Sequence, residues 1–398
     1  MAGVTKHIFE HEMQDIFSMW NSEIKTIEPL LPKSYMIDDV VDLLMEFYPH
    51  EWHSVEIKYT YYQTKDRYIK KKFGKNRYNM KRPKTLLMQS NMFKNIMSSK
   101  YQSYHFANYD EDKQLIEREN LFKKRKPKID KVNKKIETAL SKTQQITPIF
   151  IDELIGLYDR KNTSQKDKRY ILLEIKKYYS DKIIQFFFKL NDTELNQELR
   201  MEAFYHLQSF NYQPRARRQK YMQVHTKNKK KKKYLKEVYA YETYEIPKNP
   251  DELEYRIENS KEQKIKEYDY FISHSSRDSS IVQKLILSEN KQGNNVFCDW
   301  INDVDYLKRH LLCDATLKVI EKRMEQSKAM IFVSSENSLK SVWCNYELNY
   351  FAELGKPIYC ILKDDIVKNK FDLNRIEDFW FINLDYKSMA LLQGKNLF

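Results

Sequence analysis

Glycine is scarce in this chain of 398 residues, where it occurs only six times. The six glycines lie too far apart to form either a G-x-G-x-x-G motif or a Walker A loop. This scarcity excludes the usual glycine-rich cradles for phosphate groups. A nucleotide that binds to this protein must therefore be held in another way.

Cysteines and long apolar runs are also limited. The cysteines are Cys298, Cys313, Cys344 and Cys360, and no C-x-x-C pair occurs. We interpret them as buried thiols and expect no metal site. No apolar run approaches the ~18 residues of a membrane span, and the acidic N-terminus lacks the apolar core of a secretory signal. We therefore expect a cytoplasmic protein without membrane contact.

Charged residues are abundant and unevenly distributed. They make up 32% of the chain, whose net charge is +14. Residues 267–398 contain 17 basic and 19 acidic side chains, so the first 266 residues carry a net charge of +16. Hydrophobic residues, at 41%, are sufficient to form the cores of two or three domains. The charge division predicts two units with different roles.

The first part of the sequence shows helical periodicity, with apolar residues at intervals of three and four positions. We predict amphipathic helices at 36–48, 149–160, 167–190 with a short break, and 193–212. We therefore expect residues 1–262 to form an α-helical, basic domain that senses a trigger or regulates the rest. Two subdomains, 1–145 and 146–246, are an alternative division of this part.

Basic stretches separate the predicted helices, and residues 215–234 form the most basic of them. This stretch contains five consecutive lysines, Lys229 to Lys233, with tyrosines nearby. Such a pattern suits contact with phosphates and stacking on bases. The alternative is a solvated linker in a lysine-rich proteome. The trigger of the helical domain is accordingly expected to be a nucleic acid or a protein.

The last part of the sequence alternates between short apolar runs and amphipathic helices. We predict strands at 268–273, 295–300, 328–335, 357–362 and 379–384. Strands separated by helices indicate a parallel sheet that is covered on both faces. We therefore expect residues 263–398 to form an α/β domain, a flavodoxin-like five-stranded parallel sheet, after the mostly α-helical N-terminal domain.

Several blocks of this last part resemble a bacterial TIR (Toll/interleukin-1 receptor) domain. They read "YDYFISHSSRD" (268–278), "VFCDW" (296–300) and "RMEQSKAMIFVSSENSLKSVWCNYEL" (323–348). The resemblance covers about the last third of the chain. Some TIR domains act as adaptors by self-association, and others cleave NAD with the glutamate of a W-x-x-x-E motif. Trp343 and Glu347 match that motif, so the resemblance implies that Glu347 is catalytic.

The chemistry of NAD cleavage also points to a lone carboxylate. Nicotinamide is cationic in NAD and leaves as a neutral molecule, so the reaction needs stabilisation of positive charge on the ribose. Glu347 can supply it, and Trp343, which shares its helix face, offers a flat surface to a cationic ring. Asp299 and Trp300 end a predicted strand at the ligand-binding edge of the sheet, and Ser275 lies in the turn expected near the phosphates.

These features favour an NAD glycohydrolase that releases nicotinamide and ADP-ribose, with NAD as substrate and no cofactor. The resemblance implies a role in bacterial antiviral defence, where loss of NAD stops an infected cell. One alternative is a cyclase that makes cyclic ADP-ribose as a signal. Another is a non-enzymatic adaptor that self-associates through its TIR domains. The loop 301–313 corresponds to a family contact loop, although it lacks glycine and proline.

Overall fold

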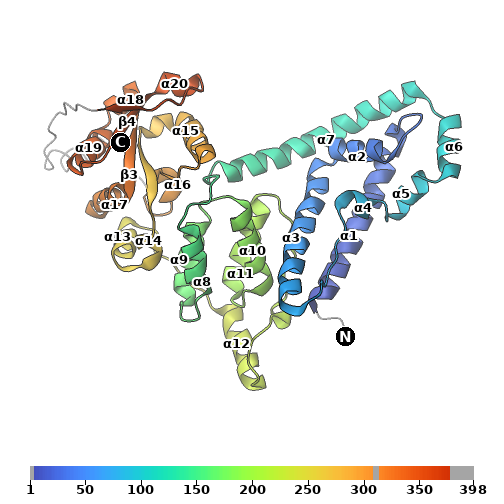
Figure 1. Cartoon of the computed structure of the whole chain (residues 1–398), viewed down its shortest axis with the longest axis horizontal. Helices are drawn as coiled ribbons and strands as arrows, with labels where there is room; N and C mark the ends of the chain where they lie inside the picture. The colour runs from blue at the N-terminus through green and yellow to red at the C-terminus, as the bar shows by residue number, and fades with distance from the viewer. Residues whose placement is uncertain (1–3, 308–312, 377–398) are drawn as a thin grey trace. The chain divides into compact units, whose positions relative to one another are not determined.

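The computed structural model describes residues 4–307 and 313–376 of the chain, and most of them are helical (Figure 1). None of the described helices is both long and apolar enough to cross a membrane. A single five-stranded sheet lies in the last third of the chain. The expected combination of a helical part followed by an α/β part is therefore confirmed.

The chain packs into two compact units. The first comprises Met1–Thr138 and Leu207–Tyr221, and the second comprises Ala139–His206 and Met222–Phe398. Helices that precede the expected boundary at residue 262 thus pack together with the sheet. Whether residue 262 separates two functional domains stays a prediction.

The first unit is built entirely from helices in its described part. They are α1 (Val4–Ile27), α2 (Ile37–Phe47), α3 (Pro49–Phe73), α4 (Pro83–Leu87), α5 (Asn91–Ile96), α6 (Ser99–Ala107) and most of α7 (Glu111–Leu140). The predicted helix at 36–48 is confirmed as α2, which carries Asp38 and Asp39 in its first turn, where carboxylates suit the helix dipole. Trp20 and Trp52 are buried in the common core.

The second unit begins with further helices. They are α8 (Ile151–Asp159), α9 (Gln165–Ile175), α10 (Asp181–Thr193), most of α11 (Gln197–Ser209), α12 (Lys229–Tyr241), α13 (Pro250–Asn259) and α14 (Lys261–Lys264). The break between α9 and α10 is held by Gln144, whose N–H donates to the carbonyl of Lys177 at 2.9 Å and whose carbonyl accepts from Tyr179 at 2.8 Å. Ser164 caps α9 by accepting from the N–H of Asp167 at 3.0 Å.

The sheet of the second unit has the strand order β2-β1-β3-β4-β5. Its strands are β1 (Tyr268–Ser273), β2 (Val296–Phe297), β3 (Ser327–Ser334), β4 (Ile358–Leu362) and β5 (Asn374–Ile376). The strands β1 to β4 pair in parallel, which gives the expected flavodoxin-like order. The doubly wound α/β fold is therefore confirmed.

Two strand predictions differ from the structure. The edge strand β5 runs antiparallel to β4, because the connection at 363–373 is shorter than the roughly twelve residues of a parallel crossover. The predicted fifth strand at 379–384 lies outside the described residues. The strand predicted at 295–300 is shorter than expected, since Asp299–Asn302 form the short helix α16 instead.

Both faces of the sheet are covered by helices, as strand β3 illustrates (Figure 1). Met330 and Phe332 pack against α17 (Asp314–Glu325) and α19 (Val342–Glu353). Ile331 and Val333 point to the opposite face, toward α15 (Ser279–Gln292) and α20 (Lys363–Val367). This alternation follows from the two-residue period of a strand. Polar side chains at the carboxyl ends of the strands are thereby brought to one edge.

Candidate active site at the carboxyl edge of the sheet

Helix α19 places Glu347 beside the end of strand β1. The helix begins after Ser341, whose hydroxyl accepts from the N–H of Cys344 at 3.3 Å. Its buried residues Cys344, Leu348 and Phe351 face the sheet. Glu347 is half-buried next to them, so it is not a solvated residue on the outer helix surface.

The carboxylate of Glu347 is held by the last residue of β1. The hydroxyl of Ser273 donates to Oε2 of Glu347 at 2.6 Å, and Ser273 itself is fully buried. Burial raises the pKa of Glu347 from 4.5 to about 8, the charge of Asp299 adds to the rise, and the hydrogen bond from Ser273 opposes it. Such a carboxylate is well suited to stabilise a positive charge placed beside it.

Asp299 and Trp300 reach the same edge from α16. Asp299 is exposed, and its charge raises the pKa values of both Glu347 and the buried Cys298, for which burial is the larger cause. The indole N–H of Trp300 donates to Nε2 of His274 at 3.0 Å. These two predicted site residues therefore lie at the carboxyl edge together with Glu347.

The ring of His274 is fixed by two neighbours. Because an indole only donates, Nε2 of His274 is the acceptor, and the ring proton sits on Nδ1, 3.2 Å from the carbonyl of Ile272. Ligand atoms of His274, Cys298 and Asp299 lie within 4.8 Å of one another, as in a metal site. Both ring nitrogens of His274 already have hydrogen-bond partners. Burial raises the pKa of the Cys298 thiol and so disfavours the thiolate that a metal would bind. These three side chains are therefore poorly suited to hold a metal. The predicted absence of a metal stays a prediction.

Trp343 and Ser275 occupy different environments. Trp343 is half-buried one helical turn before Glu347, and it lies outside the apolar core clusters among the residues that the structure describes. Ser275 caps the short 3-10 helix at 276–278, where its hydroxyl accepts from the N–H of Arg277 at 3.4 Å. Trp343 is therefore available as a flat surface, whereas Ser275 already has a local role.

A buried carboxylate, Asp278, joins the ends of three strands near this site. It accepts from Ser335 at 2.6 Å, from Asn337 at 3.0 Å and from Lys363 at 2.8 Å. Burial alone would raise the pKa of Asp278, but these hydrogen bonds outweigh burial and lower it. The negative charge of Asp278 at the start of α15 is compensated by Lys363, its ion-pair partner at 2.8 Å.

Three contacts of this edge were not predicted from the sequence: Ser273 with Glu347, His274 with Trp300, and Asp278 with the strand ends. Ser273 ends the apolar strand β1 and His274 follows it directly, which was the available signal, whereas Asp278 lies in the 3-10 helix at 276–278. The signal does not identify the partner, because each partner comes from a distant part of the chain.

A doubly wound α/β domain with a half-buried glutamate at its ligand-binding edge is the class of protein that these observations define. Residues 271–391 match the family model described as TIR domain. The "Putative cyclic ADP-D-ribose synthase TIR2" of Cytobacillus dafuensis is 36% identical over 372 residues, which cover 92% of this chain and 93% of that protein. The chain therefore belongs to the family of TIR-domain proteins.

Other relatives are similar over a shorter part of the chain. The "Probable 3' cyclic ADP-D-ribose synthase ThsB'" of Bacillus cereus (strain MSX-D12) is 32% identical over 120 residues, 30% of this chain and 59% of that protein. Toll-like receptor 2 of Bos indicus is 40% identical over 106 residues, 25% of this chain and 13% of the receptor. No solved structure shows a significant match.

Proposed function

We propose that this protein cleaves NAD at the bond between nicotinamide and ribose, with Glu347 as the catalytic residue. The observation that carries the proposal is the half-buried carboxylate of Glu347, oriented by Ser273 at 2.6 Å and preceded by Trp343 on the same helix. Positive charge develops on the ribose as nicotinamide leaves. A fixed carboxylate in a poorly solvated position stabilises that charge without first having to be reorganised.

The surrounding residues have separate roles in this proposal. Trp343 supports the cationic nicotinamide ring with its flat face. Asp299 adds a second negative charge close to Glu347. Trp300, whose indole donates to His274, lies beside Asp299 at the same edge of the sheet. Ser275 lies on the turn after strand β1, next to His274, and is the proposed neighbour of the phosphates. No general acid is required because nicotinamide leaves as a neutral molecule, and no cofactor is required because NAD is itself the substrate.

The product that we propose is cyclic ADP-ribose, which forms when a nucleophile of the same molecule, either an adenine nitrogen or a ribose hydroxyl, rather than water captures the ribose cation. The names of two relatives support this choice, one of them similar over 92% of the chain. Hydrolysis to ADP-ribose, which the sequence analysis favours, is the second candidate. Either reaction consumes NAD, and we propose that it serves antiviral defence.

The direct test is incubation of the purified full-length protein with NAD, followed by chromatography of the products. We expect nicotinamide and cyclic ADP-ribose in equal amounts. ADP-ribose as the initial product would instead identify a hydrolase. A folded protein that releases no nicotinamide under any condition that promotes assembly would contradict both reactions and favour an adaptor.

The raised pKa of Glu347 predicts a pH dependence. The carboxylate is the active form, so kcat/KM should rise about tenfold per pH unit below the pKa of about 8 and level off above it. Bound NAD brings a positive charge that lowers this pKa, so kcat should level off at lower pH. Initial rates at low and saturating NAD between about pH 6 and 9 check both profiles.

Asp299 offers an internal control, because its charge contributes to the raised pKa of Glu347. Asp299→Asn should move the midpoint of the kcat/KM profile to lower pH. A profile that is flat over this range in the unmodified protein would be incompatible with Glu347 as the titrating group.

We propose, in addition, that a polyanion such as RNA or single-stranded DNA binds to the basic stretch 215–234. Its five lysines, Lys229 to Lys233, are exposed and form the beginning of helix α12. Cations are unfavourable at a helix N-terminus because the dipole is positive there. A bound polyanion would relieve this repulsion.

Replacing all five lysines, Lys229 to Lys233, with glutamine should weaken the binding of single-stranded RNA and reduce its dependence on salt. Each lost phosphate contact should lower the slope of log K against log salt by about 0.7. Fluorescence anisotropy over a series of salt concentrations measures both quantities. The matched control replaces five exposed lysines of α7: Lys123, Lys124, Lys126, Lys128 and Lys131. Equal losses in both variants would indicate that only the overall charge matters.

Self-association through TIR domains stays part of the proposal. The expected contact loop, 301–313, is only partly described. Within its described part Asp303 and Tyr306 are buried inside the chain, so these two side chains are unavailable to a neighbouring molecule.

A further inference from the structure

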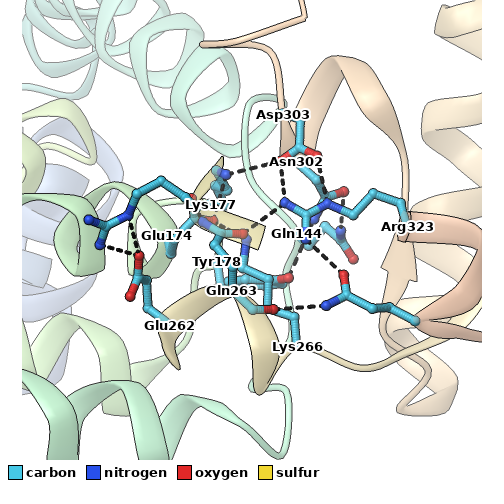
Figure 2. A network of polar contacts seen from close by, with 12 residues as sticks. Gln144, Glu174, Lys177, Tyr178, Glu262, Gln263, Lys266, Asn302, Asp303 and Arg323 are labelled. Carbon is cyan, nitrogen blue, oxygen red and sulfur yellow. Dashed lines mark hydrogen bonds and ion pairs between the residues drawn. The ribbon is translucent and has the colours of Figure 1, made fainter. Parts of the chain in front are cut away.

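Five buried charged side chains form one network in the second unit (Figure 2). They are Glu174 on α9, Lys177 just after it, Lys266 before β1, Asp303 after α16 and Arg323 on α17. Each is at most 6% exposed. Three of the five are bases and two are acids, so the network holds one positive charge that it does not balance itself. Uncompensated buried charge is costly.

Lys177 connects the two carboxylates of this network. Its ammonium group lies 2.6 Å from Glu174 Oε2 and 3.5 Å from Asp303 Oδ1. Glu174 also accepts from Lys266, and Asp303 accepts from Arg323 Nε at 2.8 Å (Figure 2). The contact between Lys177 and Asp303 is thus the longest ion pair of the network and the one most easily exchanged.

Lys266 is the member of the network whose pKa departs most clearly toward the neutral form, with burial as the main cause. The pKa of Lys266 is lowered to about 7, mainly by burial; the charges of Lys177 and Arg323 act in the same direction, and those of Glu174 and Asp303 oppose it. The ion pairs of the network join three basic side chains to only two carboxylates. A further anion next to this network would be stabilised.

A cavity of about 580 Å³ opens directly onto Lys177. Its other basic wall residues are Lys142, Arg169, Lys176 and Lys248, against three acidic side chains. Lys176 is paired with Glu202 at 2.8 Å and Lys248 with Asp305 at 3.0 Å. The walls also include four apolar side chains. All of the lining residues belong to the second unit.

We propose that this cavity binds a nucleotide, with its phosphates at the basic wall around Lys177. The volume is that of a site for a small organic ligand. The basic side chains and the excess buried charge favour phosphate. The apolar walls, which include Leu173 and Ile246, offer a surface for a base, which a simple anion would not use.

The cavity is also connected to the carboxyl edge of the sheet. Ile301, Val304 and Asp305, which line it, belong to the segment that follows Asp299 and Trp300. A phosphate that attracts Lys177 competes with Asp303 in the same segment. Ligand binding in the cavity is thereby transmitted to residues next to Glu347 and should change the activity. Only this effect on activity rests on the proposed NAD cleavage. Binding itself does not depend on it.

The test measures binding of ATP, without Mg²⁺, to the full-length protein by calorimetry at low salt. Inorganic tripolyphosphate is the comparison, because it carries similar charge without a base. We expect ATP to bind more tightly than tripolyphosphate and to raise the unfolding temperature. The double variant Lys142→Gln with Lys248→Gln, both at exposed positions, should lose at least about tenfold in ATP affinity.

The matched control is Lys182→Gln with Lys189→Gln, two exposed and paired lysines of α10 that do not line the cavity. It should bind ATP like the unmodified protein. Absence of ATP binding, or equal losses in both double variants, would overturn the proposal, and equal affinity for ATP and tripolyphosphate would overturn its nucleotide part. Cavity-dependent ATP binding by a protein that does not consume NAD would refute the proposed function alone.

Discussion

Replacing Glu347 with glutamine is expected to slow NAD cleavage by about a hundredfold to a thousandfold. The amide keeps the shape of the side chain and can still accept from Ser273, which donates to Glu347 at 2.6 Å. It lacks the negative charge that stabilises the ribose cation. Release of nicotinamide from NAD under saturating conditions measures the loss, which should appear in kcat.

The same substitution should make the protein more stable at neutral and higher pH. The pKa of Glu347 is about 8 in the folded protein, above its ordinary value of 4.5. A raised carboxyl pKa means that ionisation opposes folding, so the penalty grows as the pH rises from about 4.5 to 8. Glu347→Gln should therefore unfold at a higher temperature than the unmodified protein at pH 8, with the difference vanishing near pH 4.5.

The control for both effects is Glu353→Gln, at an exposed position on the same helix. It makes the same chemical change without touching the site and should alter neither turnover nor stability appreciably. Full activity of a folded Glu347→Gln protein would rule out this residue as the catalyst.

Replacing Arg323 with methionine should lower the free energy of unfolding by about 3–5 kcal/mol. Arg323 is fully buried and donates to both oxygens of Asp303, at 2.8 and 3.2 Å. Its loss leaves Asp303 buried with only the distant contact to Lys177, at 3.5 Å. Urea unfolding of the full-length chain, followed by circular dichroism, measures the change.

Lys322→Met is the matched control, because Lys322 is the neighbouring residue and forms an exposed pair with Glu325 at 3.0 Å. Exposed pairs contribute about 1 kcal/mol or less. Removing both partners of the buried pair, with Asp303→Leu added to Arg323→Met, should recover most of the lost stability, since neither partner is then left buried without the other. Equal effects of Arg323→Met and Lys322→Met would contradict the assigned role of the network.

The alternation of strands and helices after residue 262 was predictable because it depends on local periodicity. Short apolar runs such as 328–335, bounded by polar residues, favour buried strands, and the helix at 341–354 shows its apolar face at intervals of three and four residues. The orientation of β5 was not predictable in this way. The orientation depends on the length of the connection at 363–373, and the residues at its end show no clear alternation of apolar and polar side chains. Only the structure shows the antiparallel pairing.

The candidate site likewise combines local features, which the sequence shows, with contacts between distant residues, which it does not show. The spacing of Trp343 and Glu347 on one helix is a local property, and the W-x-x-x-E motif was sufficient to find it. The hydrogen bond from Ser273 to Glu347 joins residues 74 positions apart. Because burial and this contact set the pKa of Glu347, its electrostatic state was not accessible from the sequence.

The sequence by itself determined the family, the alternating α/β pattern and the identity of the candidate catalytic glutamate, since all three rest on short segments and their spacing. Only the tertiary structure decided which polar residues meet. It brought Glu174 to Lys266, 92 positions away, and it joined Lys177 to Asp303 beside a cavity. Such contacts depend on how distant elements pack, and in an amphipathic pattern a buried, paired lysine looks the same as a solvated one.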